Sequence, residues 1–84
     1  MPLTSEQVRA ARMLLRWEQK ELAVASGVSL PSIKRLETQP GELGAQHRTI
    51  DAIVKALEKA GVQFIDENGG GPGVRLRKPS KQRR

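Results

Sequence analysis

The side chains with the most recognisable chemistry lie in one short stretch that contains Ser32, Lys34 and Arg35. The planar guanidinium of an arginine can donate two hydrogen bonds together to the O6 and N7 atoms of guanine, and lysine or a hydroxyl can bond a base edge or a phosphate. The stretch therefore has the chemistry of nucleic-acid recognition.

The sequence contains few residues that could form a catalytic or metal-binding site. There is no cysteine, and the single histidine, His47, has no Ser, Cys or Asp constellation beside it. The glycine-rich residues 69–73 invite a phosphate-loop interpretation, but the Gly-Lys-Ser/Thr that must follow such a loop is missing. We expect no enzyme activity, no metal and no cofactor.

The positive charge of the chain lies at its C-terminal end. The formal net charge is +6, but residues 1–73 hold nine basic and nine acidic side chains. The excess comes from Arg75, Arg77, Lys78, Lys81, Arg83 and Arg84. This end is either a clamp for phosphates or a solubilising, disordered terminus. With no apolar run of membrane-spanning length and no signal-peptide pattern, we expect a cytoplasmic, nucleoid-associated protein that makes no use of a membrane.

Apolar periodicity predicts a mainly α fold with four helices. Thr4 and Gln7 have the spacing of a capping box, and Ser29 and Pro31 suit the start of a later helix. The helices are expected after Thr4 to about residue 16, and over residues 19–26, 29–38 and 48–60. Their expected apolar contacts are Val8, Ala11, Leu14, Leu15, Leu22, Ala23, Ala25, Ile33, Leu36, Ile50, Ile53, Val54 and Leu57.

The pattern changes after Gly61. Residues 62–65 and 74–77 have the composition of strands, and residues 66–73 form a turn-rich connection, so we predict a β-hairpin. Such a hairpin could pair two copies of the chain through its free edges, or it could lie as a lid on the core with Phe64 and Leu76 facing inward. The predicted units are a helical domain over residues 1–61, a hairpin over 62–77 and a disordered basic tail over 78–84.

Residues 19–37 meet the requirements of two short helices that cross at a steep angle. Ala23 is small enough for the crossing point, and Gly27 can adopt the positive φ of a tight turn. Apolar residues must fill the space behind the turn and the second helix, and these are Val28, Ile33 and Leu36. These independent requirements, met in register, predict a helix-turn-helix.

This stretch resembles the Cro/lambda-repressor-like helix-turn-helix family, also called the XRE type. The resemblance lies in Gln19, Leu22, Ala23, Gly27, Val28, Ser29, Ile33, Leu36 and Glu37, and with the flanking helices it covers roughly residues 3–60. It implies a four-helix lambda-repressor-like domain whose third helix enters the major groove of double-stranded DNA. The C-terminal hairpin departs from familiar members, which usually end in a fifth helix, so the usual dimer interface is in doubt.

The resemblance also implies which residues contact DNA. The recognition helix would begin at Ser29 and place Leu30, Pro31, Ser32 and Arg35 toward the bases, with Lys34 near the groove wall. Phosphates would be bonded by Gln19 and by the start of the fourth helix, near Gln46, His47 and Arg48.

Three other residues are expected to have structural roles, two of them by the same resemblance. Arg12 and Glu37 match a pair that links the first helix to the end of the recognition helix, which we favour over a DNA contact or a catalytic group. Trp17 is expected to pack under the turn rather than to stack on a base.

The expected function is a transcriptional regulator, most simply a repressor, that binds DNA as a homodimer. The alternative is an antitoxin-like adaptor that binds a protein partner through its hairpin or basic tail and autoregulates its operon. Single-stranded RNA binding is disfavoured, because Trp17 and Phe64 are the only aromatic residues available for stacking.

Overall fold

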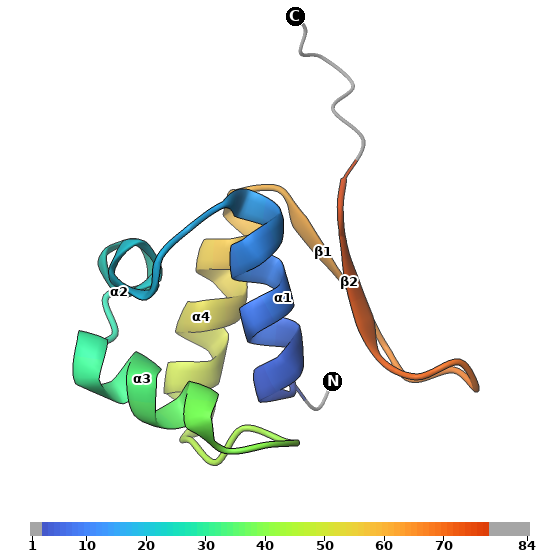
Figure 1. The fold of residues 1–84 in the computed structure, drawn as a ribbon, viewed down its shortest axis with the longest axis horizontal. Helices are drawn as coiled ribbons and strands as arrows, with labels where there is room; N and C mark the ends of the chain where they lie inside the picture. Colours follow the sequence, from blue (N-terminus) through green and yellow to red (C-terminus); the bar gives the residue numbers. More distant parts are fainter. Residues whose placement is uncertain (1–2, 78–84) are drawn as a thin grey trace, which may run out of the picture.

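The computed structural model describes residues 3–77, which form four helices and a two-stranded antiparallel hairpin (Figure 1). The predicted mainly α fold with a C-terminal hairpin is confirmed at this level. The elements are α1 (Ser5–Leu15), α2 (Gln19–Ser26), α3 (Leu30–Thr38), α4 (His47–Lys59), β1 (Val62–Ile65) and β2 (Gly73–Leu76). Between residues 3 and 77, no helix has the length and apolar character needed to cross a membrane.

Both ends of α1 are set by local hydrogen bonds. Gln7 N donates to Thr4 Oγ1 at 3.1 Å and Thr4 N donates to Gln7 Oε1 at 3.0 Å, which is the predicted capping box. At the other end Arg16 takes a left-handed conformation with φ of 59°. That residue redirects the chain toward α2.

A tight turn joins α2 to α3. Gly27 ends α2 with φ of 77°, a conformation that costs a residue with a Cβ but not glycine. Ser29 then caps α3, because its Oγ accepts a hydrogen bond from Ser32 N at 3.3 Å. Only three residues therefore separate the two helices.

The core lies between the helices and includes three residues from outside them, of which Val62 belongs to β1. Leu3 and Leu43 are both buried, and Leu43 N donates to Leu3 O at 2.9 Å. Two of the expected apolar contacts are wrong, because Ala25 and Leu14 are exposed. The inward face of α2 passes through Leu22, which leaves Ala25 outside, and the inward face of α1 passes through Val8 and Ala11. The buried core consists of Leu3, Val8, Ala11, Leu22, Ile33, Leu36, Leu43, Ile53, Leu57 and Val62.

The hairpin packs against the helices on the side away from α3 (Figure 1). β1 contacts α4 and α1, whereas β2 contacts α1. Phe64 and Val74, which are opposite each other in the register, both pack on the core. Phe64 therefore packs on the core as the lid interpretation predicts. Leu76 lies on the same face at the end of β2 but is not covered, since it remains 46% exposed.

Candidate nucleic-acid interface

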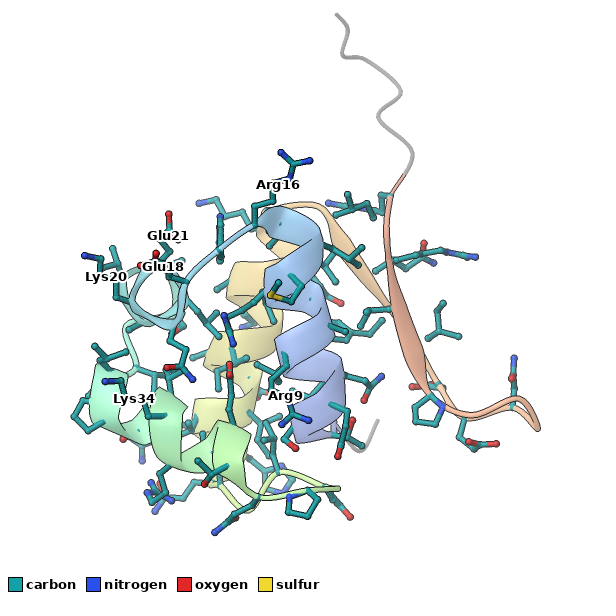
Figure 2. The ribbon with its side chains drawn as sticks, in the orientation of Figure 1. Arg9, Arg16, Glu18, Lys20, Glu21 and Lys34 are labelled. Carbon is teal, nitrogen blue, oxygen red and sulfur yellow. The ribbon has the colours of Figure 1, made fainter. Side chains whose placement is uncertain are left out.

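The helix α3 has one face in the core and one in solvent. Ile33, Leu36 and Glu37 are buried, whereas Pro31, Lys34 and Arg35 are exposed. Figure 2 shows Lys34 projecting from α3 with no other labelled side chain beside it. The two cations of this helix are thus available to an external anion.

The first turn of α3 contains two serine hydroxyls with different roles. Ser29 Oγ accepts from Ser32 N and donates its own hydrogen to Ser32 Oγ at 2.9 Å. The hydroxyl hydrogen of Ser32 is therefore left to donate to another group. Leu30, at the tip of the helix, is half-buried.

An open groove of about 660 Å³ runs between α3 and the start of α4. It brings Ser32 and Arg35 of α3 next to Gln46 and Thr49, and its lining residues are Val28, Ser32, Arg35, Leu36, Leu43, Gly44, Ala45, Gln46 and Thr49. Gln46 is the N-cap of α4 but makes no side-chain cap bond. His47 and Arg48 follow it and are exposed. Residues predicted on two separate helices thus border a single depression.

The carboxylate of Glu37 joins α3 to α1 and α2. Arg12 donates to it twice, from Nε at 2.8 Å to Oε2 and from Nη2 at 2.7 Å to Oε1. Gln19 Nε2 donates to the same Oε1 at 3.0 Å. The Arg12 and Glu37 side chains are 13% and 3% exposed. The predicted pair is therefore a buried ion pair with two hydrogen bonds. One N–H of the Gln19 amide has no partner among residues 3–77.

Two further contacts hold the end of α3, and the sequence did not predict them. Arg9 Nη1 donates to Glu37 O at 2.6 Å, and Ser5 Oγ donates to Gln39 O. Arg9 lies one turn before Arg12 on α1, so its helical spacing was the available signal. Side chains of α1 consequently hold the C-terminal end of α3 through its backbone carbonyls as well as through the Glu37 carboxylate.

Glu6 extends this attachment to the loop after α3. The pKa of the Glu6 carboxyl lies below its ordinary value of 4.5. The main cause is the backbone N–H of Glu6 itself, in the first turn of α1, and the next is the Gly41 N–H, whose nitrogen lies 3.1 Å from Oε1. Arg9 Nη2 lies 3.8 Å from Glu6 Oε2 and adds a weaker attraction. The loop that leads to α4 is therefore tied to the start of α1.

Trp17 is half-buried and packs against the core, as expected for a residue under the turn. Arg75 and Arg77 are exposed on and after β2, on the side of α1 and α4 away from α3 (Figure 1). The remaining basic residues of the predicted tail, Lys78, Lys81, Arg83 and Arg84, lie outside the described residues. The described part of the chain groups no three His, Asp or Glu side chains that could hold a metal ion.

A comparison of the chain with protein-family models finds no match, and a comparison with curated proteins finds no significant relative.

Proposed function

We propose that this chain is a transcriptional regulator, acting as a repressor, that binds double-stranded DNA sequence-specifically through α3. On this proposal the helices form a lambda-repressor-like domain in which α2, the turn at Gly27 and α3 are the helix-turn-helix. The observation that carries it is the two-sided character of α3. Lys34 and Arg35 face solvent, while Ile33, Leu36 and Glu37 hold the helix from behind.

In the proposed complex α3 lies in the major groove, and its side chains divide the work. Arg35 places its guanidinium against guanine O6 and N7, and Ser32 donates its free hydroxyl hydrogen to a neighbouring acceptor. Lys34 bonds a phosphate at the groove wall. Leu30 and Pro31, at the helix tip, contact a thymine methyl or exclude other bases.

Two helix N-termini, those of α2 and α4, would bind DNA phosphates on either side of the major groove. Gln19 retains one amide N–H beyond its bond to Glu37. At the start of α4, Gln46, His47 and Arg48 border the same groove as Arg35 or lie next to it. The unpaired N–H groups in the first turn of that helix favour an anion there.

The network around Glu37 supports this function because it fixes α3 before DNA is bound. Arg12, Gln19 and Arg9 attach the end of α3 to α1 and α2. A recognition element that is already ordered loses less conformational entropy on binding. Base discrimination then depends on a fixed position of Arg35 rather than on a flexible one.

A homodimer is part of the proposal, because one helix reads only a few base pairs. Two copies on a two-fold operator, with half-sites about 34–36 Å apart, would supply the missing specificity.

The test is selection of binding sites from random double-stranded oligonucleotides, followed by footprinting on the enriched sequence. We expect a two-fold symmetric motif and protection of two successive major grooves on one side of the duplex. The double variant Lys34→Glu with Arg35→Glu should bind no sequence selectively, whereas Lys55→Glu with Lys59→Glu, the same change of charge on α4, should select the same motif. Recovery of no enriched sequence by the unmodified chain would contradict the proposal.

A further inference from the structure

Within residues 3–77, the outer edge of β2 has backbone groups with no partner. Arg77 N donates to Gly61 O at 2.8 Å, which continues the register that pairs Gln63 with Arg75. Because hydrogen-bonded and non-bonded pairs alternate along an antiparallel ladder, the N–H and C=O groups of Val74 and Leu76 point away from β1. In residues 3–77, no hydrogen bond outside the ladder uses them. An edge of this kind can pair with another extended chain.

The two faces of β2 differ in chemistry. Val74 and Leu76 lie on the face that covers the helices, and Arg75 lies on the solvent face with Arg77 continuing the alternation. A strand added at this edge would have its own side chains alternate between the same two faces. Its binding would therefore require apolar residues on one face and residues complementary to arginine on the other.

Helix and strand geometry places one exposed apolar side chain of α1, Leu14, near the end of this edge. Gln7 Nε2 donates to Gly73 O at 3.0 Å, so Gln7 and Gly73 are level, and α1 and β2 run in the same direction (Figure 1). Leu14 is about 10 Å further along α1, and Leu76 is about 10 Å further along β2. Leu14 is also two turns from Gln7 and so shares its face of the helix. Leu14 is 41% exposed and Leu76 46% exposed.

The charge at this edge favours an acidic partner. Arg75 Nε donates to the Gln63 side-chain oxygen and Arg77 Nη2 to the backbone oxygen of Glu58, so neither guanidinium is paired with a carboxylate among the described residues. Arg16 projects at the same end of α1 (Figure 2). Acidic side chains on an added strand would meet unpaired cations.

A second copy of this chain fits the edge poorly. In an antiparallel arrangement, pairing Leu76 with Val74 places Arg75 opposite Arg75, and pairing Leu76 with Leu76 places Arg75 opposite Arg77. Like charges directly opposite each other destabilise a sheet. Pairing Leu76 with Pro72 avoids this opposition but loses a hydrogen-bond donor, since proline has no N–H.

We propose that the free edge of β2 binds an extended acidic segment of a partner protein by strand addition. Acidic residues of that segment lie beside Arg75 and Arg77, and the alternating apolar residues lie beside Leu76 and Leu14. This surface and α3 lie on opposite sides of α1 and α4 (Figure 1). The chain can therefore bind the acidic segment whether or not α3 is on DNA.

The test uses the full chain and a fluorescein-labelled peptide of sequence Glu-Val-Glu-Val-Glu-Val-Glu, with binding measured by anisotropy. The isomer Glu-Glu-Glu-Glu-Val-Val-Val should bind about tenfold more weakly, because it cannot place charged and apolar side chains on alternate faces. Hydrogen exchange at Val74 N and Leu76 N should slow when the alternating peptide is added. Arg75→Glu with Arg77→Glu should abolish binding, whereas Lys55→Glu with Lys59→Glu should leave it unchanged.

A second variant separates the edge from the charges. Leu76→Pro removes an outward N–H and an apolar side chain but no inward ladder bond, so the hairpin should persist while peptide binding falls. The far-ultraviolet circular dichroism of each variant checks its fold. Arg35→Ala should leave peptide binding unchanged, which keeps this test independent of the DNA proposal.

Several results would overturn the strand-addition proposal. One is equal affinity for the two peptides, which would mean attraction by charge alone. Another is absence of binding at about 1 mM peptide, the weak end of specific recognition. If light scattering shows that the chain self-associates, and Leu76→Pro abolishes this self-association, the edge would bind a second copy of the chain. If the unmodified chain binds no peptide, and the Arg75→Glu, Arg77→Glu variant loses affinity for DNA, the edge would be part of a nucleic-acid-binding surface instead.

Discussion

The cations of α3 are the residues on which base discrimination depends in the proposed complex. Lys34 and Arg35 are neighbours in the chain and both exposed, but Arg35 also borders the groove that includes Ser32 and Gln46. A guanidinium can bond two base atoms at once, whereas an ammonium acts as a point charge. The two residues should therefore respond differently to substitution.

Arg35→Ala should cost about 1–3 kcal/mol of binding free energy on the selected site and relax the preference at one base position. Lys34→Ala should weaken binding to all sequences about equally, because a phosphate contact has no base preference. Fluorescence anisotropy on the selected site and on each single-base variant measures both effects. If Arg35→Ala weakened all sequences equally, Arg35 would be a phosphate contact and the assignment would be wrong.

The ion pair of Arg12 and Glu37 matters for stability because of its burial. Arg12→Met would leave the Glu37 carboxylate, with its side chain 3% exposed, without its main partner. We expect a loss of about 3–5 kcal/mol in the free energy of unfolding, since an unpaired buried charge is strongly destabilising. The double variant Arg12→Met with Glu37→Leu should lose less, because it removes both charges.

Urea denaturation of the two variants measures this difference, with Arg48→Met, a change at an exposed arginine, as the control. A double variant less stable than Arg12→Met would show that Glu37 contributes through its bonds to Gln19 and α3 more than through its charge.

At the scale of elements, the loop between α3 and α4 is anchored to the N-terminal segment. Ser5 N donates to Gly41 O at 2.9 Å, and Leu43 N donates to Leu3 O at the same distance. The Glu6 carboxylate accepts the Gly41 N–H in return. The loop borders the groove beside α3, so its position determines where the start of α4 lies relative to Arg35.

The lowered pKa of Glu6 predicts a pH dependence with a definite sign. The folded state favours the ionised carboxylate, so the stabilisation is complete above the ordinary value of 4.5 and is lost as the pH falls through the lower folded-state pKa. Between about pH 6 and pH 3, Glu6→Gln should lose less stability than the unmodified chain. The midpoint of urea unfolding at each pH measures this, with Glu58→Gln as the control. Parallel pH profiles for Glu6→Gln and the unmodified chain would contradict it.

At the scale of the whole molecule, the exposed cations lie on two sides of the helical core. Lys34 and Arg35 are on α3, and Arg75 and Arg77 are with the hairpin on the opposite side (Figure 1). The charge of residues 1–73 is balanced, so the body of the protein has little general attraction for DNA. In the proposed complex, general affinity for DNA would therefore depend on the C-terminal end.

Truncation after Lys78 removes Lys81, Arg83 and Arg84, and it should lower affinity for specific and non-specific DNA alike. Each lost phosphate contact should reduce the slope of log affinity against log salt by about 0.9. Anisotropy titrations at several salt concentrations measure the slope, and replacement of the same three residues by glutamine is a length-matched control that should give the same change. An unchanged slope would show that these residues do not contact the backbone.

The sequence was sufficient for features that depend on a few neighbouring residues. The capping box of Thr4 and Gln7, the turn at Gly27 and the apolar faces of α3 and α4 follow from spacings within one or two helical turns. For the same reason the ends of the elements were close, with α4 beginning at His47 rather than Arg48 and β2 at Gly73 rather than Val74. Side-chain and backbone preferences act at this range without help from the rest of the fold.

The tertiary structure decided what depends on contacts between distant segments. Gln7 caps α1 but also bonds Gly73, which lies 66 residues further along the chain, and no local pattern encodes that second role. The exposure of Leu14 and Leu76 likewise depends on how the hairpin lies against α1, because each could have been buried with its own periodicity unchanged. The sequence by itself thus determined the four helices, the hairpin and the exposed cations of α3. Only packing decided that Arg35 borders a groove and that, within residues 3–77, the edge of β2 has no partner.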